Sequence, residues 1–157
     1  MSYCRGSPGA EGLCATAWLA SLEDEERRAV EERWYTSLNA EQFRVLRMRG
    51  TESPHAGRYT NLFDAGTFLC AGCSQPLYES GMKFQSGHGW PAFTDSLPDA
   101  IIRRTARGKV EVACAGCGGH IGHIFRSSRY PPPNHERHCV NSASLRFVPA
   151  DTWQVPV

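Results

Sequence analysis

The sequence lacks any long apolar run. No stretch of its 157 residues approaches the roughly 20 apolar residues that a membrane-spanning helix needs. The first residues also lack the apolar core of a secretory signal, because small residues and proline dominate positions 5–12. These absences predict a soluble, cytoplasmic protein. Mitochondrial import is the alternative, but Arg5 is the only arginine before the acidic run at 23–26.

An excess of charge of either sign is also missing. The 17 basic and 16 acidic residues leave a net charge of +1, whereas nucleic-acid binders depend on clustered lysine and arginine. We therefore expect no nucleic-acid partner. The length fits one ordinary domain, and we predict that residues 1–20 form a flexible arm and residues 21–157 form a single domain.

The chain changes its pattern near residue 57. Before that point, residues 21–38 and 39–50 read as two short helices, the second opened by an Asn39–Gln42 capping box and ended by Gly50. Ser21 marks the expected start of the first helix. From residue 57 onward the chain contains short strand-like segments: TFLC, KVEVAC, HIGHIF and CVNSASLRFV. Two long loops are expected among them, at residues 86–98 and 127–136. The predicted fold is mainly β and antiparallel.

Four of the seven cysteines form two C-A-G-C pairs, Cys70 with Cys73 and Cys114 with Cys117. Zinc prefers tetrahedral thiolate coordination, and each C-x-x-C turn places two sulfurs on one side of a metal. We predict a structural four-thiolate zinc site that joins two separate hairpins. Redox-active dithiols are the alternative reading of the same pairs.

Three cysteines lie outside these pairs: Cys4, Cys14 and Cys139. Only Cys139 falls in the β half of the chain. Because side chains alternate along a strand, a strand from Cys139 onward places further residues on the same face. These are Asn141, Ala143, Leu145 and Phe147. A lone strand cysteine can also be a small buried hydrophobe, so the spacing leaves both readings open.

Two histidines and a tryptophan accompany this thiol. His120 and His123 flank a glycine, which allows a bulge to turn both toward one side, and imidazole can stabilise a thiolate or donate a proton. They could equally satisfy backbone groups near the zinc pairs. Trp90 stands among glycines in the 86–98 loop, where it either lines a pocket or joins the core.

These segments together resemble the B-type methionine sulfoxide reductases, which act on the R epimer. The similarity extends from Glu32 to Ala150 and is carried by RVLRMRGTESPHAGRY, the two CAGC pairs, LYESGMKFQSGHGWPAF, HIGHIF and RHCVNSASLRFVP. It implies an Mss4-like fold of two antiparallel sheets stapled by zinc. It also implies repair of oxidised proteins, with thioredoxin or a small thiol as the reductant.

The resemblance assigns the chemistry to Cys139 as nucleophile and His123 as the group that protonates the sulfoxide oxygen. Cys139 would become a sulfenic acid, which a second thiol must reduce. Five more residues match positions that line or support the family's pocket: His120 and Asn141 as polar groups, Trp90 against the substrate methyl group, and Phe125 and Arg137 beside it.

The chain departs from the family at several positions. His88 stands where many members have their resolving cysteine, His138 replaces an aromatic residue before the nucleophile, and serines 127 and 128 replace an Asp-Gly turn. Cys4 or Cys14 could therefore resolve the sulfenic acid, or an external thiol could attack Cys139 directly. A zinc-ribbon-like binding module or an Mss4-like chaperone without catalysis is the alternative function.

Overall fold

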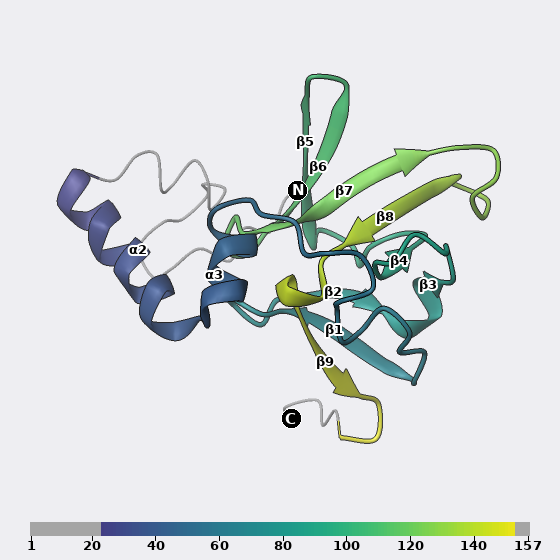
Figure 1. Cartoon of the computed structure of the whole chain (residues 1–157), viewed down its shortest axis with the longest axis horizontal. Helices are drawn as coiled ribbons and strands as arrows, with labels where there is room; N and C mark the ends of the chain where they lie inside the picture. The colour runs from purple at the N-terminus through teal and green to yellow at the C-terminus, as the bar shows by residue number, and fades with distance from the viewer. Residues whose placement is uncertain (1–22, 153–157) are drawn as a thin grey trace.

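Two antiparallel sheets form the body of the protein (Figure 1). The structure is a computed structural model, and it describes residues 23–152. The smaller sheet has the order β2–β1–β9, with β1 at Gly66–Cys70, β2 at Pro76–Glu79 and β9 at Leu145–Pro149. The larger sheet has the order β3–β4–β8–β7–β6–β5. The predicted class of fold, mainly β with two antiparallel sheets, is confirmed.

The larger sheet carries most of the strand residues. Its strands are β3 (Lys83–Phe84), β4 (Ala92–Phe93), β5 (Ile101–Ala106), β6 (Lys109–Cys114), β7 (His120–Arg126) and β8 (Glu136–Val140). The short strand β4 lies within the stretch predicted as the 86–98 loop, because its two residues pair with both β3 and β8. The predicted 127–136 loop is confirmed as the β7–β8 connection.

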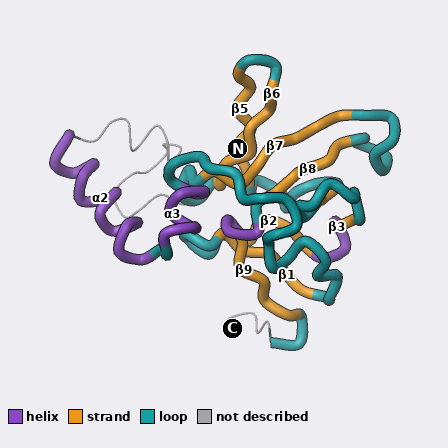
Figure 2. The backbone as a smooth tube through the Cα atoms, in the orientation of Figure 1, coloured by secondary structure: helices purple, strands orange, loops and turns teal. Residues whose placement is uncertain are grey.

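Two helices lie at one end of the sheets, as expected (Figures 1 and 2). Helix α2 is observed over Asp24–Ser37, whereas its predicted start at Ser21 lies outside the described residues. Helix α3 spans Ala40–Leu46, and its predicted capping box is confirmed: Asn39 Oδ1 accepts from the Gln42 amide at 2.8 Å and Gln42 Oε1 from the Asn39 amide at 3.0 Å.

The end of α3 differs slightly from the prediction. The helix stops at Leu46 rather than at Gly50, and Arg49 takes a positive φ of 59°. The Gly50 amide then donates to the Arg44 carbonyl at 2.9 Å, so the glycine still satisfies a carbonyl at the end of the helix. No helix in the described part of the chain is both long and apolar enough to cross a membrane.

An aromatic cluster fills the space between the two sheets. Phe68 of β1 contacts Phe93 of β4 and Phe147 of β9, with ring centroids 5.1 and 4.9 Å apart. Tyr78 of β2 stacks on Phe93 at 4.2 Å. Phe68, Tyr78 and Phe93 are fully buried, and burying an aromatic side chain of this size stabilises the fold by about 2–3 kcal/mol.

The predicted strand through CVNSASLRFV is wrong in one respect. Strand β8 ends at Val140, the residues Ser142–Ser144 form a 3-10 turn, and Leu145 starts β9 in the other sheet. Polar side chains explain the break, because Asn141 bonds with the Glu52 amide (3.0 Å) and the Ile121 carbonyl (3.1 Å), instead of extending a strand. Leu145 and Phe147 therefore do not share a face with Cys139.

Candidate active site and metal centre

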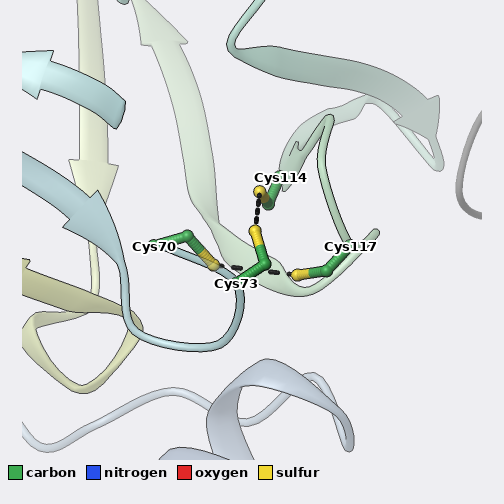
Figure 3. A group of neighbouring side chains, drawn as sticks. All are labelled: Cys70, Cys73, Cys114 and Cys117. Atoms are coloured by element: carbon green, nitrogen blue, oxygen red, sulfur yellow. Dashed lines mark hydrogen bonds between the residues drawn. The ribbon is translucent and has the colours of Figure 1, made fainter. Parts of the chain in front are cut away.

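Four cysteine sulfurs form a cluster where the two sheets meet (Figure 3). Cys70 ends β1 and Cys73 follows in the β1–β2 turn, while Cys114 ends β6 and Cys117 follows in the β6–β7 turn. Their sulfurs all lie within 4.8 Å of one another, with Cys70–Cys117 at 3.7 Å and Cys73–Cys114 at 3.5 Å. One turn from each sheet thus contributes two thiols.

The local sequence of the second pair is suited to this cluster. The Gly116 amide donates to Cys114 Sγ at 3.3 Å, a bond that stabilises a thiolate. A Cβ at position 116 would lie 2.9 Å from Cys73 Sγ, so any larger residue would push the two turns apart. The small residue at position 116 thus lets a backbone amide approach a cysteine sulfur. The four thiols can hold one metal ion that joins the two sheets.

A cavity of about 160 Å³ opens beside the larger sheet. It brings together six of the predicted site residues: Trp90, His123, Phe125, Arg137, Cys139 and Asn141. The remaining lining residues are Thr51, His88 and Gly122. These groups come from β7, β8 and the residue after it, the loop before β4 and the segment after α3, so the pocket forms only when these distant segments are brought together.

Cys139 lies on β8, opposite His123 of β7 and Ala92 of β4. Burial raises the pKa of the Cys139 thiol, and the neighbouring Arg137 guanidinium opposes this rise by its charge and a hydrogen bond. Arg137, expected as a supporting residue, is therefore the cation that favours the thiolate. A Cβ at Gly122 would lie 2.0 Å from the Cys139 carbonyl oxygen, so glycine permits the close approach of β7 and β8 here.

The two histidines lie on one side of β7, as a bulge was expected to allow. The β6–β7 register shifts between Val112 and Ala113, and the two imidazole centroids are 5.3 Å apart. His123 lines the pocket, whereas His120, expected beside it, is not among the lining residues. His120 is 2 % exposed and its Nδ1 lies 3.1 Å from a Glu111 carboxylate oxygen. Burial is the main cause that lowers the pKa of both imidazoles.

The aromatic wall of the pocket is held by specific contacts. The Arg137 guanidinium stacks over Phe125 at 4.5 Å, and its Nε donates to the Tyr130 hydroxyl at 3.1 Å. Tyr130 belongs to the proline-rich 127–136 loop. On the other side, Trp90 Nε1 donates to the Glu52 carbonyl at 3.0 Å, which fixes the indole plane.

Glu52 is a site residue that the sequence reasoning missed. It is buried, with 5 % exposed, and its carboxylate accepts a hydrogen bond from the Ser142 amide. The backbone of Glu52 makes two more bonds: its amide donates to Asn141 Oδ1, and its carbonyl accepts from Trp90 Nε1. One residue therefore positions two walls of the pocket. Burial raises the pKa of the Glu52 carboxyl, while the Ser142 and Ala143 amides oppose that rise. The only sequence signal was its place in the segment RVLRMRGTESPHAGRY.

Regeneration of the thiol concerns His88, which replaces the family's usual resolving cysteine, and the candidate resolving thiols Cys4 and Cys14. His88, at the position of the family's usual resolving thiol, is exposed and lines the pocket with Cys139. Cys4 and Cys14 lie outside the described residues, as does the predicted arm at 1–20. The five cysteines of the described part, including Cys139, are all free thiols.

The fold and the site define a class of protein: two β sheets that meet at a four-cysteine cluster able to hold a metal ion, with a separate thiol in an aromatic pocket that contains histidine and arginine. The model of the SelR domain matches residues 38–149. This chain belongs to the SelR-domain family of B-type peptide methionine sulfoxide reductases.

Curated relatives agree with this assignment. Peptide methionine sulfoxide reductase B5 of Oryza sativa subsp. japonica is 47 % identical over 84 % of this chain and 99 % of its own length. The chloroplastic B2 protein of Arabidopsis thaliana is 50 % identical over 83 % of the chain, and the chloroplastic B3 protein of Oryza sativa subsp. japonica is 52 % identical over 76 %. The matches span 66 % and 53 % of those two longer relatives, respectively.

Proposed function

We propose that the protein reduces the R epimer of methionine sulfoxide in proteins and peptides, and so repairs oxidised methionine. One observation carries the proposal: Cys139 shares a single pocket with Trp90, His123 and Arg137. A binding module or chaperone would have no use for a half-buried thiol beside a cation. We also infer that residues 21–157 act as the reductase domain, which includes the matched range 38–149.

The proposed reaction uses residue types suited to each step. The Cys139 thiolate, favoured by Arg137, attacks the electrophilic sulfur of the sulfoxide, and His123 supplies a proton to its oxygen. The attack forms a bond between Cys139 Sγ and the substrate sulfur. The substrate S–O bond then breaks as the protonated oxygen passes to Sγ, and the transient Sγ–S bond breaks, so two electrons pass from Cys139 to the substrate. The products are the methionine thioether and a Cys139 sulfenic acid, which carries the oxygen.

Selectivity for one epimer follows from a two-sided pocket. Trp90 and Phe125 offer aromatic surface for the methyl group, while His123 and Asn141 offer polar groups for the oxygen. In the S epimer the oxygen and the lone pair on sulfur exchange places. With the methyl group on the aromatic side, the oxygen would then point away from the polar groups. Because Glu52 bonds to both Trp90 and Asn141, the apolar and polar sides are held at a fixed separation.

We propose that the four-cysteine cluster binds one zinc ion. Zinc–sulfur bonds of about 2.3 Å in a tetrahedron place the sulfurs about 3.8 Å apart. The distances of 3.5 and 3.7 Å between paired sulfurs fit such a tetrahedron. Four thiolates complete the coordination, so the metal would stabilise the contact between the sheets and take no part in the reduction.

Regeneration requires a second thiol, which we expect to come from thioredoxin or a small thiol reductant. Cys4 and Cys14 are the candidates within the chain, and direct attack by the external thiol is the alternative. Substituting both cysteines and measuring thioredoxin-supported turnover separates these routes, since unchanged turnover would exclude the arm. We keep the cytoplasm as the proposed location, although two relatives are named as chloroplastic, and cell fractionation tests it.

The proposal is tested with separate R and S epimers of a methionine-sulfoxide peptide in the presence of dithiothreitol. We expect reduction of the R epimer alone, with turnover abolished in Cys139→Ser. Equal reduction of both epimers, or full activity in that variant, would contradict the proposal. Cys73→Ser is a control that also removes one thiol. We expect its main effects to be lower metal content and lower stability, rather than loss of the nucleophile.

A further inference from the structure

The buried carboxylate of Glu111 on β6 has no role in the reaction described so far. It is 4 % exposed and forms ion pairs with Arg49 and, at 3.7 Å, with Arg104. Two arginines already compensate one buried negative charge, so the cluster does not need a histidine for neutrality. His120 nevertheless bonds to the same carboxylate, with Nδ1 3.1 Å from Oε1.

This bond fixes the tautomer of His120. An ionised carboxylate can only accept, so Nδ1 carries the hydrogen and Nε2 is left as an acceptor. Nε2 is buried and has no hydrogen-bond partner among the described residues. The neighbouring aromatic ring is His123, whose centroid lies 5.3 Å away with the planes at 64°. Glu111 is also the direct cross-strand partner of His123.

Glu111 therefore bonds to His120, and the His120 ring contacts the ring of His123, which lines the pocket of Cys139. We propose that Glu111 is a positioning residue for proton transfer: acting through His120, it keeps one proton on the histidine pair, and His123 delivers that proton to the sulfoxide oxygen. The inference rests on the proposed function. The pair becomes neutral as the sulfenic acid forms, and it regains a proton from solvent.

The charges around the pair show why an anion is needed there. Burial lowers the pKa of both imidazoles, and the cations that face them, Arg49, Arg104 and Lys109, lower it further. On β8, Cys139 faces His123 and Arg137 lies in the same pocket, so that side adds another cation. Glu111 opposes all of these and favours the protonated form of each histidine.

The larger sheet provides a matched control for Glu111. Glu136 on β8 is likewise a buried carboxylate, held by Arg103 and Arg126, and it too bonds to a buried histidine. That histidine, His138, bonds onward to the hydroxyl of Tyr78 between the sheets and not to a pocket imidazole. Loss of either carboxylate removes the same kind of ion cluster, but of the two only Glu111 bonds to a histidine whose ring contacts His123.

The test measures single-turnover reduction of the R-sulfoxide peptide across about pH 5–9 in wild type, Glu111→Gln and Glu136→Gln. Loss of the negative charge lowers the pKa of the histidine pair, so the proton is lost at lower pH. We expect Glu111→Gln to stay within about threefold of wild type at the acidic end and to fall about tenfold or more below it near pH 8. Glu136→Gln is expected to lower thermal stability without moving the profile along the pH axis.

Superimposable profiles for Glu111→Gln and wild type, or equal shifts in both variants, would overturn the inference. Nitrogen NMR of the wild-type protein gives a second readout that does not depend on a variant folding. The inference requires His120 to carry its hydrogen on Nδ1, and an Nε2–H tautomer would refute it. A wild-type protein that fails to reduce the R epimer would instead defeat the proposed function, while the tautomer measurement would still test the Glu111–His120 bond.

Discussion

Strands β7 and β8, which carry His123 and Cys139, approach most closely at Gly122, and this approach allows a quantitative test. A Cβ at this position would lie 2.0 Å from the Cys139 carbonyl oxygen, 2.9 Å from its carbonyl carbon and 3.0 Å from Val140 Cα. All three are backbone atoms, so no side-chain rotation relieves the clash. Because carbon–oxygen contacts settle near about 3.3 Å, Gly122→Ala must separate the strands by about 1 Å.

We predict that Gly122→Ala lowers the free energy of unfolding by about 2–4 kcal/mol, from overpacking and weakened ladder hydrogen bonds. A displacement of this size at the nucleophile also predicts a loss of about 100-fold in single-turnover rate. Urea denaturation and quenched-flow assays measure the two effects. Gly81→Ala is the matched control, because nothing lies within 4 Å of a Cβ added there. Wild-type stability and rate in Gly122→Ala would refute the reasoning.

Three further predictions follow from the charges and the metal centre. Arg137→Gln removes the cation beside Cys139, so the thiol pKa should rise and iodoacetamide alkylation near pH 7 should slow several-fold; an unchanged pH profile of alkylation would contradict this. Metal removal by a chelator should release one ion per chain and sharply lower the melting temperature, whereas a metal-free protein of equal stability would argue against a structural ion. The pKa of Glu136 is lowered to about 2, mainly by its hydrogen bond to Arg103 and less by those to His138 and Arg126. This carboxylate therefore stabilises the fold above about pH 4.5 and loses that effect as the pH falls toward 2. The stability difference between wild type and Glu136→Gln, about 3 kcal/mol at neutral pH, should therefore shrink over that range in acid denaturation, and a constant difference would oppose it.

The parts of the site that the sequence could predict are those set by short-range chemistry. Each C-A-G-C turn and the Asn39–Gln42 capping box depend on residues within a few positions of one another. Their geometry is dictated by local spacing, so a pattern in the sequence suffices to predict them.

The remaining features depend on packing between distant segments. The strand break at Asn141 arises from bonds to Glu52 and Ile121, residues far away in the sequence. Glu52 and Glu111 look like ordinary surface acids until the fold buries them. His120 was expected in the pocket because its spacing from His123 is compatible with it, but its bond to Glu111 holds it behind His123.

The central claim is that Cys139 takes the oxygen from the R epimer of methionine sulfoxide. Its most direct test is a single turnover without reductant, in which methionine formed per chain is compared with the oxidation state of Cys139 by mass spectrometry and sulfenic-acid trapping. We predict methionine from the R epimer alone, matched one for one by oxidation of Cys139. Methionine formation with Cys139 left reduced, or equal yields from both epimers, would contradict the claim.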